Sequence, residues 1–246
     1  MMPAQALLAA ACPGLAVEVV AEIGSTNSEL MGRVRDGLPG PVLLVAEHQT
    51  AGRGRLGRAW ASRPGDSLTF SLAVPLSPAD WSGLSLAAGV ALAEALHPRV
   101  TLKWPNDLWL DGRKLGGILV ETAASASGGR AAVIGVGLNL LAPAPEGLSI
   151  APAGLRELLP DISAAQVLQR VVPPLLDTVW LFEHAGFTPF QARFTARDAL
   201  RGLAVRLSDG REGMARGVAA DGALLVHTAA GLHSVHSSEV SVRPAA

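Results

Sequence analysis

Three glycines and three arginines alternate from Gly52 to Arg58, and an apolar run typical of a β-strand lies on each side. The spacing G-x-G-x-x-G occurs through Gly52, Gly54 and Gly57. In a dinucleotide-binding fold, a helix follows this spacing directly and aims its N-terminus at the pyrophosphate. The pair Pro64–Gly65 prevents such a helix here. The segment is therefore predicted to be a loop between two strands.

This arginine-glycine loop suits an anionic ligand. Its glycines leave the backbone N–H groups unobstructed, and the guanidinium groups project between them, so phosphate or carboxylate can be surrounded by fixed donors. Trp60 at the edge of the loop offers an aromatic face for a purine. Two alternatives remain open, a solvated basic surface loop and an RNA-binding loop. The second is disfavoured because aromatic residues make up only 4% of the chain.

Composition excludes several classes of protein. The 246 residues are 49% hydrophobic and 17% charged, which argues against disorder. There is no apolar run of about 18 residues, and the N-terminus makes a poor secretory signal, so no membrane partner is expected. Cys12 is the single cysteine, which excludes an intramolecular disulfide and a cysteine-based zinc site. A net charge of −1 gives no overall attraction to nucleic acid. A reducing, cytoplasmic compartment is predicted.

Hydrophobic patterning predicts alternating strands and helices in the first 199 residues. Asp111-Gly112 is a hairpin turn signal, and Thr26 with Glu29 three residues later matches a helix capping box. The predicted strands are 17–23, 41–48, 67–74, 116–122 and 130–140, with two short strands around Pro105-Asn106. The predicted helices are one beginning at residues 25–27, and others near 78–96, 163–184 and 189–199.

The character of the sequence changes over the last 45 residues. Short β-like runs are separated there by DG, DG and AG turns at close spacing, the pattern of a small antiparallel barrel. A boundary near Ala199–Leu200 follows. We therefore predict two domains, residues 1–199 and residues 200–246.

The two lysines of the chain lie eleven residues apart, although arginine occurs eighteen times. Lys103 is followed by Trp104-Pro105-Asn106-Asp107, and Lys114 is followed by Leu115-Gly116-Gly117. A lysine, an amide and a carboxylate within five residues suit a nucleotide triphosphate with its magnesium, because the cation meets phosphate oxygens and the carboxylate is a hard oxygen ligand. The alternative is a β-hairpin with ordinary surface charges.

The run Ile134–Leu140 contains Gly135 and Gly137 inside an otherwise apolar strand. Glycines in a strand usually mark close approach of another backbone or of a ligand. Asn139 is polar in a run suited to burial and must find hydrogen-bond partners. Core packing with a satisfied asparagine is the alternative interpretation.

In this order and spacing, GRGRLGRAW, KWPNDLWLDGRKLGGILVE and IGVGLNL resemble the biotin protein ligases. Ser25-Thr26-Asn27 and Glu47-His48-Gln49 stand where that family has its STN and E-x-Q elements. The resemblance covers about residues 17–141. It implies an α+β fold, a mixed β-sheet with helices on one face like that of class II aminoacyl-tRNA synthetases, followed by a small C-terminal SH3-like β-barrel.

The resemblance also implies a two-step reaction. The carboxylate of biotin attacks the α-phosphorus of ATP with Mg²⁺, giving biotinyl-5′-AMP and pyrophosphate. A lysine amine on a biotin carboxyl carrier protein or domain, of the acetyl-CoA-carboxylase type, then attacks the adenylate and releases AMP.

Site residues follow from the same motifs. The implied catalytic residues are Lys114, Arg55 and Lys103. The implied biotin-binding residues are Ser25, Thr26, Asn27, Gln49, Gly52, Arg53, Gly54, Arg55, Lys114 and Gly117. The implied nucleotide-binding residues are Trp60, Lys103, Asn106, Asp107 and Asn139, and Asp107 is the candidate magnesium ligand.

Two departures from the family pattern are visible. Leu56 stands where many members have a further arginine, so the loop closes less tightly or does not need that charge. Only sixteen residues precede the first predicted strand, too few for a helix-turn-helix, so we expect a monofunctional ligase without DNA as a partner. A homodimer through the sheet is expected. The alternatives are a lipoate–protein ligase and a non-catalytic RNA- or anion-binding module.

Overall fold

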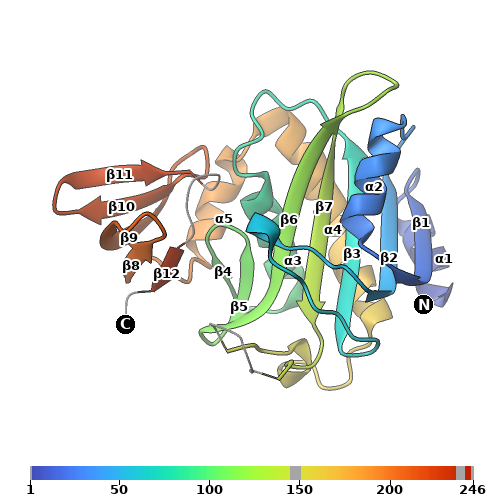
Figure 1. Ribbon diagram of the computed structural model, residues 1–246, viewed down its shortest axis with the longest axis horizontal. Coiled ribbons are helices and arrows are strands. Elements are labelled where there is room, and N and C mark those ends of the chain that lie inside the picture. The colour runs from blue at the N-terminus through green and yellow to red at the C-terminus, as the bar shows by residue number, and fades with distance from the viewer. Residues whose placement is uncertain (1, 145–150, 237–241, 245–246) are drawn as a thin grey trace.

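A seven-stranded mixed sheet forms the centre of the molecule in the computed structural model, which describes residues 2–144, 151–236 and 242–244. Its strand order is β1-β2-β3-β7-β6-β5-β4 (Figure 1). Only β1 and β2 run parallel, and the other neighbours are antiparallel. The strands are β1 (Ala16–Ile23), β2 (Val42–Gln49), β3 (Ser67–Pro75), β4 (Val100–Lys103), β5 (Asp107–Leu110), β6 (Arg113–Ala124) and β7 (Arg130–Asn139).

Helices cover both faces of this sheet. The larger layer consists of α1 (Met2–Ala11), α3 (Leu84–Leu96), α4 (Ala164–Ala185) and α5 (Gln191–Thr195), which share the main core cluster with the sheet. On the opposite face, α2 (Thr26–Arg35) buries Leu30 and Val34 against a smaller cluster on the sheet (Figure 1). The mixed sheet with a helical layer is confirmed, and α2 adds a helix on the second face.

Three helix boundaries differ from the prediction. The N-cap of α2 is Ser25, whose hydroxyl accepts from the amide of Ser28, so the predicted Thr26 cap is wrong. Helix α3 begins at Leu84, after Gly83 in a left-handed conformation, and not near residue 78. Helix α5 ends at Thr195 because the chain then pairs with β4. The amide of Leu102 donates to the carbonyl of Arg197, and the amide of Ala199 donates to the carbonyl of Leu102.

A second, antiparallel sheet of five strands follows, in the order β11-β10-β9-β8-β12. The β-rich C-terminal part is confirmed. Within the described residues, however, the sheet is open and not the expected closed barrel, because β12 pairs with β8 at the edge away from β11. The strands are β8 (Ala204–Leu207), β9 (Glu212–Val218), β10 (Leu224–Thr228), β11 (Gly231–Val235) and β12 (Val242–Pro244).

Trp104 joins the two sheets. It directly follows β4, its side chain is 1% exposed, and its indole N–H donates to the carbonyl oxygen of Gly222 at 3.0 Å. Gly222 has φ +82°, and a Cβ at this position would lie 2.9 Å from the Cα of Gly83. The turn between β9 and β10 therefore packs closely against the start of α3 and fixes the end of β4. Among the described residues, no helix has the length and apolar character needed to cross a membrane.

Trp104→Phe tests this link. The phenyl ring fills most of the space but leaves the Gly222 carbonyl without its donor, so the free energy of unfolding should fall by about 1–3 kcal/mol. Chemical denaturation measures the change, and Trp180→Phe, on the half-exposed face of α4, is the control. Equal stability of the two variants would contradict the role given to the indole N–H.

Candidate active site

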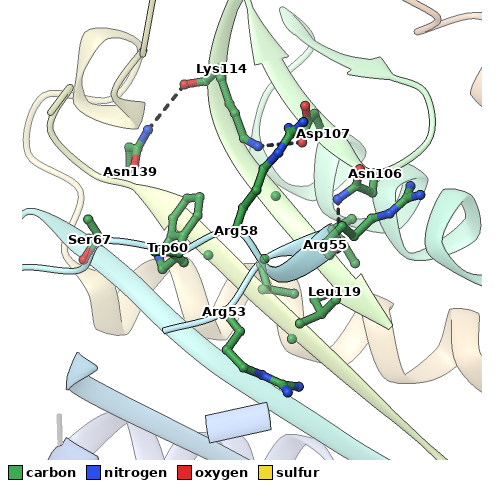
Figure 2. A pocket seen from close by; sticks show the side chains of 18 of the residues that line it. Arg53, Arg55, Arg58, Trp60, Ser67, Asn106, Asp107, Lys114, Leu119 and Asn139 are labelled. Carbon is green, nitrogen blue, oxygen red and sulfur yellow. Dashed lines mark hydrogen bonds and ion pairs between the residues drawn. The ribbon is translucent and has the colours of Figure 1, made fainter. Parts of the chain in front are cut away.

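One cavity of about 800 Å³ collects the predicted site residues. It lies where the β1–α2 turn, the end of β2, the arginine-glycine segment and the β4–β5–β6 hairpins meet (Figure 2). Val242 of β12 also lines it. Of the predicted residues, all but Gly52 line the cavity: Ser25, Thr26, Asn27, Gln49, Arg53, Gly54, Arg55, Trp60, Lys103, Asn106, Asp107, Lys114, Gly117 and Asn139.

The arginine-glycine segment is a small hairpin. Arg53 and Ala59 form an antiparallel bridge, and the amide of Gly54 donates to the carbonyl of Arg58 at 2.7 Å. A 3-10 turn forms the tip (Arg55–Gly57), where Leu56 adopts φ +56° and is 68% exposed. The two ends of the hairpin are tied by the amide of Trp60, which donates to the carbonyl of Gly52 at 2.9 Å.

Gly52 shapes the wall of the cavity without lining it. A Cβ there would overlap the carbonyl oxygen of Trp60 and lie 3.1 Å from Nε2 of Gln49. A larger residue would therefore push the base of the hairpin away from β2. The predicted importance of Gly52 is structural in this geometry.

Trp60 lies over β7 because Gly137 has no side chain. A Cβ at Gly137 would overlap the indole ring. The indole Nε1 is buried and, in the part of the chain that the structure describes, has no hydrogen-bond partner. An unpaired buried donor is costly, so an acceptor on a ligand in this cavity would be stabilising. The glycines of β7 thus mark a close approach, as the sequence predicted.

Cationic groups converge around Asp107. Its Oδ1 lies 2.7 Å from Nζ of Lys114, and its Oδ2 lies 3.8 Å from Nζ of Lys103. Lys103 is 6% exposed, and its ammonium also lies 5.5 Å from the centre of the Trp109 ring. Burial lowers the pKa of Arg55, and the nearby carboxylate of Asp107 opposes that shift. Arginine keeps its charge even so, and the cavity therefore presents three cations near one carboxylate.

Two asparagines brace the backbone beside these charges. Nδ2 of Asn106 donates to the carbonyl of Ile118 at 2.8 Å. Nδ2 of Asn139 donates to the carbonyls of Lys114 and Ala153, at 3.3 and 3.1 Å. Asn139 thus ties the start of β6 to residues 151–153. Its hydrogen-bond partners, which the sequence left open, are these carbonyl groups.

A chain of hydrogen bonds crosses the other end of the cavity. Oε1 of Gln49 accepts from the backbone amide of Thr26 at 2.7 Å. The hydroxyl of Thr26 lies 2.7 Å from that of Ser71, and Ser71 donates to Oδ1 of Asn27 at 2.7 Å. Because Oε1 of Gln49 is held as an acceptor, its Nε2 is oriented as a donor. All four side chains are buried, so the donor and acceptor pattern of this end is fixed.

Sequence reasoning missed Ser71 and Glu121. Glu121 of β6 accepts from Nδ2 of Asn27 at 2.9 Å and from the guanidinium of Arg53. The signal for Ser71 was a hydroxyl inside the apolar run 67–74, and Glu121 ends the GGILVE run. Gly135 makes room for this arrangement, since a Cβ there would overlap Oδ1 of Asn27.

The donor set does not fit a resident metal ion. Both oxygens of Asp107 face lysine ammonium groups. The described residues hold no group of three or more His, Cys, Asp or Glu side chains that could share an ion. Magnesium commonly binds through one or two carboxylates together with substrate phosphates, so any ion here would arrive with its phosphate ligands.

Gly137→Ala tests the packing of Trp60. The added methyl group overlaps the indole, so the ring must move and the free energy of unfolding should fall by about 1–3 kcal/mol. Gly32→Ala is the matched control, because nothing lies within 4 Å of a Cβ there and alanine in a helix should stabilise by about 0.5–1 kcal/mol. Thermal or chemical denaturation of both variants measures the difference, and equal values would exclude the close contact.

Both parts of the chain match known protein families. Residues 21–139 match the biotin/lipoate A/B protein ligase family, and residues 204–243 match the biotin protein ligase C-terminal domain. A protein from Paracoccus denitrificans named biotin–[acetyl-CoA-carboxylase] ligase is 31% identical, over 90% of this chain and 98% of that protein. The bifunctional ligase/repressor BirA of Escherichia coli is 34% identical, over 94% of this chain and 75% of that protein.

A solved structure is similar over nearly the whole chain. The biotin protein ligase from Aquifex aeolicus, in complex with biotin and ATP, has a TM-score of 0.80 and 28% identity, covering 94% of this chain and 99% of that one. The sequence motifs and the fold thus agree with these matches. The chain belongs to the biotin protein ligase family.

Proposed function

We propose that this protein is an ATP-dependent biotin protein ligase that makes biotinyl-5′-AMP and transfers biotin to a lysine of a biotin carboxyl carrier domain. The observation that carries the proposal is the meeting of the arginine-glycine hairpin with Lys103, Asp107 and Lys114 in one cavity. The printed names of the Paracoccus relative and of the Aquifex complex with biotin and ATP support the same substrates.

The first step joins biotin to the nucleotide. An oxygen of the biotin carboxylate attacks the α-phosphorus, and the bond to pyrophosphate breaks. Negative charge accumulates on the phosphate oxygens, where fixed cations stabilise it most in a site that excludes water. Lys114 binds the carboxylate and the α-phosphate, and Lys103 and Arg55 meet the other phosphate oxygens. Asp107 holds Lys114 at 2.7 Å, and so fixes the ammonium group before substrate arrives.

The second step transfers the acyl group. The uncharged amine of the acceptor lysine attacks the carbonyl carbon of the adenylate, the bond from carbon to the phosphate oxygen breaks, and AMP leaves while the amine loses a proton. Lys114 remains beside the mixed anhydride and offsets the charge on the departing phosphate. The hairpin at residues 52–60 shields the adenylate from water until the acceptor arrives.

The ring of biotin binds at the end of the cavity formed by Ser25, Thr26, Asn27 and Gln49. Its ureido group has one carbonyl acceptor and two N–H donors. The fixed orientation of Gln49 and the buried hydroxyls beside it can match such a pattern. Trp60 and Asn139 flank the nucleotide end, and Gly117 lets the ligand approach β6. Magnesium enters as part of the nucleotide substrate.

Four further expectations stay predictions. They are the division into a catalytic domain at 1–199 and a C-terminal domain at 200–246, the homodimer, the absence of a DNA partner, and the cytoplasmic location.

Biotin-dependent exchange of labelled pyrophosphate into ATP tests the proposed function. Exchange should require biotin and should be absent with lipoate, because the hydrogen-bonding end of the cavity suits a ureido ring. Exchange with lipoate alone would identify a lipoate–protein ligase. No exchange with either acid, together with salt-sensitive binding of RNA, would favour the anion-binding module.

Lys114→Ala should lower the rate of adenylate formation by about 10²–10³-fold, the effect of removing one fixed donor from a charged transition state. The fold should persist, because this side chain is 34% exposed. Single-turnover formation of biotinyl-AMP measures the rate. Arg99→Ala is the control, since Arg99 pairs with Asp111 on the surface and does not line the cavity. Near-normal turnover of Lys114→Ala would remove this lysine from the mechanism.

A further inference from the structure

Glu121 lies behind the cavity wall and binds two residues that line it, Asn27 and Arg53. One of its carboxylate oxygens, Oε2, accepts a hydrogen bond from Nδ2 of Asn27 at 2.9 Å and also forms the ion pair with Arg53. The side chain of Glu121 is 27% exposed, and that of Arg53 is 45% exposed. A single oxygen therefore joins α2, which carries Asn27, to the arginine-glycine hairpin.

On the α2 side, Glu121 is the charged end of the hydrogen-bond chain that reaches Gln49. Nδ2 of Asn27 donates to Glu121 and to the carbonyl of Leu119, so the Oδ1 atom of Asn27 must face Ser71. Ser71 uses its proton on Asn27. The hydroxyl of Thr26 has two acceptors within reach for its one proton, Oγ of Ser71 at 2.7 Å and Oε1 of Gln49 at 3.0 Å. The carboxylate thus sets which way the amide of Asn27 faces and, through it, the hydrogen bond that Ser71 donates.

On the other side, Glu121 holds the base of the hairpin. Arg53 begins the hairpin through its bridge to Ala59, and it points to the opposite side of the segment from Arg58 (Figure 2). Arg55 and Arg58 also line the cavity, and Arg58 extends toward Asp107 and Lys114 (Figure 2). The three arginines therefore divide into one that anchors the hairpin on β6 and two that face the charged end.

An isolated exposed ion pair contributes little to stability. This pair differs because its carboxylate also binds Asn27, which is 3% exposed. The amide of Asn27 is held by Glu121 on one side and by Ser71 on the other. A weaker acceptor at position 121 would affect the buried hydrogen bonds of Asn27 and the hairpin at the same time, since both depend on Oε2 of Glu121.

We propose that Glu121 is a positioning residue that couples the biotin-ring end of the cavity to the arginine-glycine hairpin. Its charge keeps the hairpin against the cavity and fixes the donors for the ring, and so sets how long biotinyl-AMP is retained. The proposal rests on the proposed function for its kinetic consequences, but the positioning of the hairpin does not depend on any ligand.

Glu121→Gln separates charge from shape, because glutamine keeps the size and one acceptor oxygen but loses the ion pair. Glu94→Gln is the matched control, since Glu94 pairs at similar exposure with Arg193, which does not line the cavity, whereas Arg53 does. Hydrogen exchange of the backbone amides at residues 52–60 is measured first, without ligand. We expect exchange about five- to tenfold faster in Glu121→Gln and unchanged in Glu94→Gln, the change for the loss of one partly exposed hydrogen bond. Arg53→Gln should give the same increase, and the double variant should add nothing to it.

Kinetics then separate positioning from general loss of structure. In Glu121→Gln, the KM for biotin should rise about five- to tenfold and release of biotinyl-AMP should accelerate similarly, because the ring donors and the hairpin loosen together. The KM for ATP should change less than twofold. Equal rises in both KM values with a lower melting temperature would show a merely structural role and overturn the proposal.

The two proposals fail in different ways. If the unmodified protein gives no biotin-dependent exchange, the proposed function fails, while hydrogen exchange still tests Glu121. If the unmodified protein is active and Glu121→Gln matches it in hydrogen exchange and in the KM for biotin, the positioning role is wrong.

Discussion

The carboxylate of Asp107, set between the ammonium groups of Lys114 and Lys103, is the interaction on which the site depends. Two lysines and an arginine in one cavity would repel one another, and a single carboxylate both offsets that repulsion and orients the cations. The surrounding fold serves this arrangement. Strands β4 and β5 are short, and the buried side chain of Trp104 fixes the turn between them, so Lys103 and Asp107 face each other across adjacent strands.

Glycines, which have no side chain, are as important to the cavity as the charged residues. Gly135 and Gly137 alternate along β7, and each leaves the space that a functional side chain occupies, Asn27 in one case and Trp60 in the other. Gly116 on β6 serves the sheet itself, because a Cβ there would meet the carbonyl of Gly137 at 2.5 Å. The sheet can therefore lie directly under the ligand site while its strands stay paired.

Much of this could be predicted from the sequence, because the signals were local. Apolar runs predicted the central strands to within a few residues, and Asp111-Gly112 does form the hairpin turn, with both residues at positive φ. The motifs also predicted which residues share the cavity. The errors and omissions have tertiary causes. The chain after Thr195 leaves its helix to pair with β4, a partner almost a hundred residues earlier. Ser71 and Glu121 carry no motif, and their importance comes from Asn27, which reaches them across the sheet.

The last described strand reaches back to the cavity, since Val242 contributes to its wall, whereas α1 packs beside β1 at the far edge of the central sheet (Figure 1). The two strips of structure are therefore not equivalent for engineering. A side chain exchanged in β12 at position 242 would change the shape of the cavity, whereas none of the described residues of α1 lines it and exchanges there would leave its wall untouched.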